Sequence, residues 1–252
     1  MTRTRRPRTA GRAAIVAAGL LAGLALAGCG LLPALPGPLP TDLVPSVNPG
    51  ASPTTTGNLS PDGFDAARRM AVRIRNVGCS SLSTGSGFAI DANTLITNRH
   101  VVADSADLQL STYDGRDIAA TAASTAALAD LAIVRTVDTL PAFPQLAPAD
   151  PKTGDAVTVV GYPQGGQLTV TSGRVIGATT DPLNENLGEV LVADAPVEPG
   201  SSGSAVLDAE GRVVGVVYAK NSDDMSFIVP VSTLRGMLAD ESAFVPSPTC
   251  TG

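Results

Sequence analysis

The chain has 252 residues, is 44% hydrophobic and contains 26 glycines, 20 prolines and no tryptophan. This length allows one or two domains, and the many turn residues favour short strands over long helices. The first 28 residues carry five arginines and no acid, so the remainder holds 12 basic and 23 acidic residues and a net charge of −11. Such an acidic body argues against binding to nucleic acid or to an anionic membrane surface.

The N-terminus has the pattern of an export signal. Its arginines precede the apolar run 13–27, which is too short for a transmembrane helix but suits the apolar region of a signal peptide. The sequence LAGC at 26–29 resembles a bacterial lipobox, with cleavage before Cys29 and lipid on its sulfur. We therefore predict a lipoprotein signal peptide over residues 1–28, and export to the outer face of the cell membrane or cell envelope with the lipid on Cys29 as anchor. Cleavage without lipidation is the alternative.

A proline-rich segment separates this signal from a folded domain. Residues 30–61 contain eight prolines among glycine, serine and threonine, which predicts a semi-extended linker over 29–61 and a folded domain over 62–252. A short helix is predicted over 61–70. Strands are predicted over 71–77, 85–90, 93–98, 106–113, 116–123 and 130–137.

The second half of the domain repeats this style. Residues 141–155 contain four prolines and no apolar period, which predicts a crossover between two halves. Strand-like segments follow at 156–162, 167–179, 188–197, 203–219 and 225–231, and then a helix over 231–240 that Ser232 would cap. Two groups of about six strands predict an all-β protein, built either as two small barrels (about 64–140 and about 154–240) or as a sandwich.

Two cysteines remain besides Cys29, namely Cys79 and Cys250. An exported domain meets an oxidising compartment, so two cysteines near opposite ends of one domain predict a disulfide, with two free thiols as the alternative. The bridge would close a loop of 171 residues. Disulfides usually stabilise a fold by about 2–4 kcal/mol.

Three segments carry residues suited to acyl-transfer chemistry. His100, the only histidine, follows the predicted strand TLITN, and Asp130 stands in the otherwise apolar run ALADLAIV. A buried carboxylate is costly unless paired, and an imidazole N–H would satisfy it and fix the ring's tautomer. Ser202 lies in VEPGSSGSAVLD, where glycines permit the sharp turn that exposes a nucleophilic hydroxyl. Taken singly, each segment also fits an ordinary strand end or hairpin turn.

The order His100, Asp130, Ser202, with spacings of 30 and 72 residues, is that of the chymotrypsin-like proteases and differs from that of subtilisins and α/β-hydrolases. On the motifs TNRHVV, ADLAIV and PGSSGS, residues 64–245 resemble trypsin-like serine proteases of the bacterial HtrA type. The resemblance implies two six-stranded antiparallel β-barrels with a short C-terminal helix and the site between the barrels. No PDZ-like segment is expected after it. The cysteine positions resemble those of the periplasmic acid-resistance proteases of actinobacteria, which carry membrane helices where this chain has a lipobox.

The resemblance also implies the residue roles. His100 would be the general base, Asp130 its orienting partner and Ser202 the nucleophile, with the N–H groups of Gly200 and Ser202 forming the oxyanion hole. Tyr218 stands where relatives often have a serine that supports the aspartate. Because this serine is replaced, we expect Asp130 to be less well supported.

Further departures from the family pattern concern the neighbours of the predicted triad. Ser201 replaces an aspartate that pairs with a new N-terminus in chymotrypsin relatives, so activation by N-terminal clipping is not expected. Ser204 replaces a glycine of the family pattern, and Arg99 replaces a small residue.

By the same register, five residues would form the primary substrate pocket: Pro196 and Val197 at its base, and Tyr218, Ala219 and Lys220 along its wall. No carboxylate lies at the base. We therefore expect small to medium apolar residues at the P1 position of substrates, and no preference for Arg or Lys.

Together these features predict a serine endopeptidase that cuts envelope or misfolded exported proteins through an acyl-enzyme. The alternatives are a catalytically inactive binding module on a protease scaffold and another serine hydrolase, which the chain order and the missing G-x-S-x-G elbow disfavour. One histidine cannot build a zinc site, so no metal or cofactor is expected. We also expect that its partners are protein or peptide substrates, that the lipid on Cys29 attaches it to the membrane and that it is a monomer.

Overall fold

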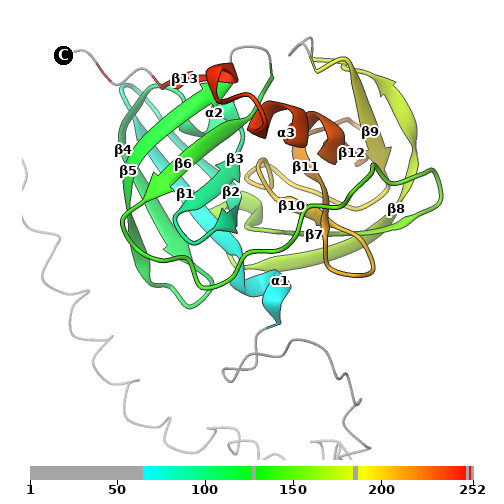
Figure 1. The fold of residues 1–252 in the computed structure, drawn as a ribbon, viewed down its shortest axis with the longest axis horizontal. Helices are drawn as coiled ribbons and strands as arrows, with labels where there is room; N and C mark the ends of the chain where they lie inside the picture. Colours follow the sequence, from blue (N-terminus) through cyan, green and yellow to red (C-terminus); the bar gives the residue numbers. More distant parts are fainter. Residues whose placement is uncertain (1–64, 127–128, 184–186, 248–249, 251–252) are drawn as a thin grey trace, which may run out of the picture. The chain divides into compact units, whose positions relative to one another are not determined.

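The computed structural model describes residues 65–126, 129–183, 187–247 and 250 (Figure 1). The predicted signal peptide, Cys29, the whole predicted linker and the domain entry up to residue 64 lie outside these residues. Within them, no helix combines the length and apolar content needed to span a bilayer.

The first half of the described chain forms a closed six-stranded antiparallel barrel. A short helix, α1 (Ala66–Arg69), leads into it. Its strands are β1 (Ala71–Gly78), β2 (Leu82–Asp91), β3 (Thr94–Thr97), β4 (Ser105–Thr112), β5 (Asp117–Ala126) and β6 (Ala132–Thr136). The ring runs β1–β2–β3–β6–β5–β4 and closes between β4 and β1.

The second half forms another closed barrel with the same connectivity (Figure 1). Its strands are β7 (Ala156–Gly161), β8 (Thr169–Thr180), β9 (Glu189–Ala193), β10 (Ala205–Leu207), β11 (Val213–Lys220) and β12 (Ser226–Pro230). The ring runs β7–β8–β9–β12–β11–β10, and a one-turn 3₁₀ helix, η2 (Pro163–Gly165), follows β7. This arrangement confirms the predicted fold of two six-stranded barrels and excludes the sandwich.

The core consists mainly of aliphatic side chains, with a few aromatic residues among them. In β1, Val72 and Ile74 are fully buried while Arg75 is exposed, which is the alternation expected of a barrel strand. One apolar cluster combines Phe88 of the first barrel with Val160 and other residues of the second. The two barrels therefore pack directly against each other through apolar side chains.

Two helical segments differ from the prediction. The helix α2 (Arg99–Val102) directly follows β3, so His100 lies in a helical turn and not at a strand end. The C-terminal helix α3 (Val231–Leu238) was predicted, but the predicted cap is wrong: Pro230 is the N-cap and Ser232 lies in the first turn. The carboxylate of Asp150 accepts hydrogen bonds from the Ser232 backbone N–H at 2.8 Å and from its hydroxyl at 2.6 Å, and thereby caps the helix from a distant part of the chain.

The C-terminal segment returns to the first barrel. After η3 (Glu241–Ala243), strand β13 (Phe244–Pro246) pairs with β5 in a register that places Phe244 opposite Ala126. The sequence analysis did not predict this strand. It covers the edge of β5 and brings the chain end toward the start of the domain.

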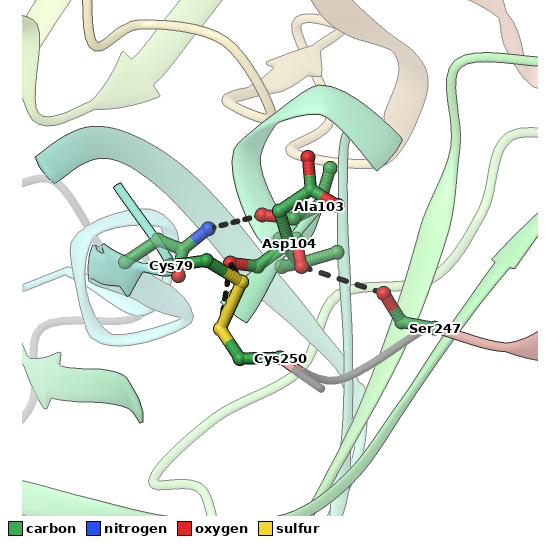
Figure 2. The surroundings of a disulfide bond; sticks show 7 residues. Cys79, Ala103, Asp104, Ser247 and Cys250 are labelled. Atoms are coloured by element: carbon green, nitrogen blue, oxygen red, sulfur yellow. Dashed lines mark hydrogen bonds between the residues drawn. A yellow bond between two sulfur atoms is a disulfide. The ribbon is translucent and has the colours of Figure 1, made fainter. Parts of the chain in front are cut away.

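Cys79 and Cys250 form the predicted disulfide, with their Cα atoms 5.5 Å apart (Figure 2). The bridge lies beside the segment that leaves α2. The backbone N–H of Cys79 donates to the carbonyl of Asp104 at 2.9 Å, and the side-chain amide of Asn76 donates to the carbonyl of Ala103 at 2.8 Å. The chain end is therefore fastened close to the helix that carries the only histidine.

Candidate active site

His100 is held by contacts of both its backbone and its ring. Its Nδ1 lies 2.6 Å from Oδ2 of Asp130, and its backbone N–H donates to Oδ1 of the same carboxylate at 3.0 Å. The imidazole is 49% exposed on the surface, whereas the Asp130 side chain is 4% exposed. The imidazole is therefore accessible from outside while the carboxylate is shielded from water.

Asp130 lies in the connection between β5 and β6, between the buried residues Ala129 and Leu131. Its carboxylate accepts two hydrogen bonds from His100, and its own carbonyl accepts one from the side-chain amide of Asn98 at 2.7 Å. An Asp that accepts from Nδ1–H fixes the tautomer in which Nε2 is the proton acceptor. Tyr218, which stands where the family pattern has a serine that supports the aspartate, instead donates its hydroxyl proton to Asp181 at 2.9 Å.

The segment before Ser202 forms a turn with a defined peptide orientation. Ser201 N–H donates to the carbonyl of Glu198 at 2.8 Å, Pro199 occupies the second position, and Gly200 has a φ of +93°. These features match a type II turn, in which the third residue needs a positive φ. The Pro199 carbonyl accepts from Gln164 N–H at 2.6 Å. Because the peptide is planar and trans, the Gly200 N–H points in the opposite direction, away from Gln164.

The backbone donors around Ser202 are not engaged elsewhere. Within the described residues, neither the Gly200 N–H nor the Ser202 N–H donates to another protein group. The Ser202 carbonyl accepts from Ser86 N–H at 2.8 Å, which ties the turn to the first barrel. The turn therefore offers two backbone donors that a substrate oxygen could use.

Gly203 brings residues 198–202, called the nucleophile turn after the role predicted for Ser202, against the strand that leads to His100. It has a φ of +85°, and a Cβ at this position would lie 2.0 Å from the Ser86 carbonyl and 2.5 Å from Oγ1 of Thr97. Only glycine allows so close an approach. Among the described residues the Ser202 hydroxyl and the His100 ring are not hydrogen-bonded, and catalytic hydrogen bonds of this kind often tighten only when substrate binds.

The five residues predicted for the substrate pocket lie in two places. Pro196 and Val197 line a cavity of about 130 Å³ that is also bounded by residues of β7 and β8. Tyr218, Ala219 and Lys220 of β11 are not among its lining residues, and Tyr218 is 2% exposed.

Lys220, at the end of β11, forms an ion pair with the residue that follows Val197. Its Nζ lies 3.3 Å from the Glu198 carboxylate and 3.0 Å from that of Asp224. These hydrogen bonds, chiefly the one to Asp224, raise the pKa of Lys220. The ion pair thus links the end of β11 to the first residue of the nucleophile turn.

Within the described ranges no three His, Cys, Asp or Glu side chains come together in a way that could hold a metal ion. The arrangement is instead that of an acyl-transfer site: an oriented imidazole, a serine in a sharp turn and unengaged backbone donors.

Three residues of this region were missed by sequence reasoning. Asn98 holds the carbonyl of Asp130, Gln164 orients the Pro199–Gly200 peptide, and Ser86 contacts the nucleophile turn. For Ser86 a signal existed, since it stands between two glycines within a strand. At both glycines an added Cβ would lie under 3.0 Å from a neighbouring atom.

The two barrels and this site define the chymotrypsin-like class of proteins, and comparisons with known proteins agree. A family described as the trypsin-like peptidase domain matches residues 85–216. Serine protease Rv3671c of Mycobacterium tuberculosis (strain H37Rv) is 33% identical over 196 residues, covering 72% of this chain and 48% of that protein. Mitochondrial serine protease HTRA2 of Bos taurus is 31% identical over 205 residues, covering 76% and 45%.

The crystal structure of the active form of Rv3671c protease from M. tuberculosis superposes with a TM-score of 0.65 at 30% identity, over 74% of this chain and 88% of that chain. This chain therefore belongs to the trypsin-like peptidase domain family, and HtrA-type serine proteases are among its relatives. It spans about half the length of the curated relatives it matches.

Proposed function

We propose that this protein is a serine endopeptidase with His100, Asp130 and Ser202 as its catalytic triad. The observation that carries the proposal is the double contact of the buried Asp130 carboxylate with the His100 backbone and ring. This contact orients the imidazole and stabilises its protonated form, which is the task of the aspartate in such triads. Family membership and relatives named serine proteases support the same reaction.

The reaction would proceed through an acyl-enzyme. Ser202 Oγ attacks the carbonyl carbon of the scissile peptide bond while Nε2 of His100 takes the hydroxyl proton. The oxyanion that forms accepts from the N–H groups of Gly200 and Ser202, both unengaged within the described residues. The imidazolium then protonates the leaving amine as the C–N bond breaks. Water, deprotonated by His100, hydrolyses the ester and regenerates Ser202.

A fluorophosphonate probe tests the triad directly, because it reacts only with an activated serine. We expect the full-length protein to be labelled, and Ser202→Ala and His100→Ala to lose labelling. Ser111→Ala, which removes a hydroxyl from the outer face of β4, is the matched control and should be labelled like wild type. A folded, disulfide-bonded wild type that is not labelled would favour a catalytically inactive binding module.

For the substrate we propose peptides with small to medium apolar side chains at P1. The support is the absence of a carboxylate at Pro196 and Val197. Glu198 lines the same cavity, but its pairing with Lys220 partly neutralises this acid. Cleavage rates on a peptide library that varies P1 would test this. A dominant preference for Arg or Lys would contradict it.

We further propose that the protein acts as a monomer on envelope or misfolded exported proteins while anchored through lipid on Cys29. The support is the lipobox at 26–29 and the disulfide, which suits an oxidising compartment. A relative in Hahella chejuensis is named a probable periplasmic serine endoprotease. Labelling with a clickable palmitate should place wild type, but not Cys29→Ser, in the lipid-modified membrane fraction. Equal labelling of both proteins would refute the anchor.

A further inference from the structure

Ser86 occupies an unusual place for a polar side chain. It lies in β2, is fully buried, and its hydroxyl stands between two backbone groups of the second barrel. The hydroxyl accepts from Tyr162 N–H at 2.8 Å and donates to the Gly200 carbonyl at 2.8 Å. Burying a hydroxyl is unfavourable unless its hydrogen bonds are made, and here both are made across the seam between the barrels.

The backbone of Ser86 adds two more contacts. Its N–H donates to the Ser202 carbonyl at 2.8 Å, and its carbonyl accepts from the hydroxyl of Thr97 at 2.7 Å. Thr97 lies three residues before His100. One residue of the first barrel therefore bonds the carbonyls of both Gly200 and Ser202 and also the strand that leads to the histidine.

The neighbours of Ser86 show that this part of β2 is fitted to the seam. A Cβ at Gly85 would lie 2.4 Å from Val101 in α2, and a Cβ at Gly87 would lie 2.9 Å from the Ile96 carbonyl. Side chains at either position would push β2 away from α2, which carries His100, or from β3, which precedes it. The sequence Gly-Ser-Gly thus allows close packing on one side and reaches the nucleophile turn on the other.

We propose that Ser86 is a positioning residue, whose side-chain hydroxyl holds the Gly200 peptide so that the oxyanion donors face the scissile carbonyl. The inference rests on the proposed roles of Gly200 and Ser202. Gly200 is the most pliable residue of the turn, and the carbonyls of its two flanking peptides each have one partner outside the turn: Gln164 N–H for the Pro199 carbonyl and the Ser86 hydroxyl for the Gly200 carbonyl.

Loss of the hydroxyl leaves two buried backbone groups without partners. The Gly200–Ser201 peptide then rotates so that the Gly200 carbonyl reaches another donor. This rotation changes ψ of Gly200 and φ of Ser201, and it thereby shifts the neighbouring N–H groups of Gly200 and Ser202 from the position of the oxyanion. Because oxyanion donors act mainly in the transition state, the loss should fall on kcat and not on KM. A hydroxyl with a merely structural role would lower stability and leave both kinetic constants unchanged.

Ser86→Ala is the test, measured as kcat and KM on a peptide substrate together with urea unfolding. We expect kcat to fall by about 10- to 100-fold with KM changed by less than about threefold. Affinity for a peptidyl boronic acid, which forms a tetrahedral adduct with the serine, should fall in parallel with kcat. Thr136→Val is the matched control, because it removes a buried hydroxyl that donates to a carbonyl at 2.8 Å at the end of β6.

The control should lower the unfolding midpoint as Ser86→Ala does and leave kcat unchanged. If Ser86→Ala does not fold, Ser86→Cys keeps the side-chain shape with a weak donor and should show the same loss of kcat with unchanged KM. A folded Ser86 variant with wild-type kcat would overturn the inference while the proposed function stands. A wild type without turnover or fluorophosphonate labelling would overturn both.

Discussion

The substitution Gly200→Ala tests whether the nucleophile turn requires the backbone conformation and the close packing that only glycine allows at this position. Gly200 has a φ of +93°, and an added Cβ would lie 2.6 Å from the backbone nitrogen of Gln164 and 3.0 Å from that of Gly165. Both contacts are with backbone atoms, so a side-chain rotation cannot relieve them. The η2 segment or the turn must move, and either movement disrupts the hydrogen bond from Gln164 N–H to the Pro199 carbonyl.

Two separable penalties follow from this geometry. Holding an alanine at positive φ costs about 1–2 kcal/mol of stability. Displacing the Pro199–Gly200 peptide removes one oxyanion donor, which typically lowers kcat by about 10²- to 10³-fold, or about 2.7–4 kcal/mol in the barrier. The kinetic penalty should therefore exceed the stability penalty.

Gly211→Ala separates the two penalties. Gly211 also has a positive φ, of +77°, but an added Cβ meets no heavy atom within 4 Å. It should lose about 1–2 kcal/mol of stability, which is the part of the Gly200→Ala penalty that comes from positive φ alone, with unchanged kcat. The assay is kcat and KM on one peptide substrate, with urea unfolding of each variant. Wild-type kcat in a folded Gly200→Ala would refute the assignment of its N–H to the oxyanion hole.

Four further predictions concern the triad, the disulfide, a buried hydroxyl and a buried phenol. Asp130→Asn should lower kcat by about 10⁴-fold because it favours the wrong tautomer of the imidazole; a loss under tenfold in steady-state assays would contradict this role. Replacing Cys79 and Cys250 together by alanine should lower the unfolding free energy by about 2–4 kcal/mol, and an unchanged urea midpoint would refute it. Ser204→Ala removes a fully buried hydroxyl without a hydrogen-bond partner, so its midpoint should not fall below that of wild type. Burial raises the pKa of Tyr162 from 10.0 to about 12. Between these values the unfolded chain loses a proton that the folded protein keeps, so the stability of the fold decreases as pH rises. Tyr162→Phe lacks this proton and should show a smaller decrease in the urea midpoint over the same pH range.

Much of the fold could be predicted because barrel strands have local signatures. The alternation in 71–77 and the turn at Asp114 and Gly115 correspond to β1 and to the β4–β5 hairpin. The pairing of His100 with Asp130 was also predictable, since a lone aspartate in an apolar run requires a partner. Neighbours in sequence and the cost of burying charge supported these inferences, and the resemblance to trypsin-like proteases supplied the choice of two barrels and the role of Asp130.

Features that depend on distant parts of the chain could not be predicted in this way. The acceptor that caps α3 at Ser232 is Asp150, 82 residues away, and the hydroxyl of Ser86 reaches a carbonyl 114 residues away. Strand β13 exists because its pairing partner β5 is available, although its own three-residue sequence ends in a proline, Pro246. Local periodicity carries no information on such partners.

The seam between the barrels requires more than apolar packing to hold the turn of Gly200 and Ser202 in a fixed position relative to His100. Apolar contacts such as those of Phe88 and Val160 bring the barrels together but are non-directional, so they tolerate small shifts of one barrel against the other. Hydrogen bonds have defined directions and lengths. The bonds of Ser86 to Gly200, Ser202 and Thr97 are therefore the contacts that can fix the register between the turn and the histidine strand. Strengthening the apolar seam should raise stability without restoring the activity of a Ser86 variant.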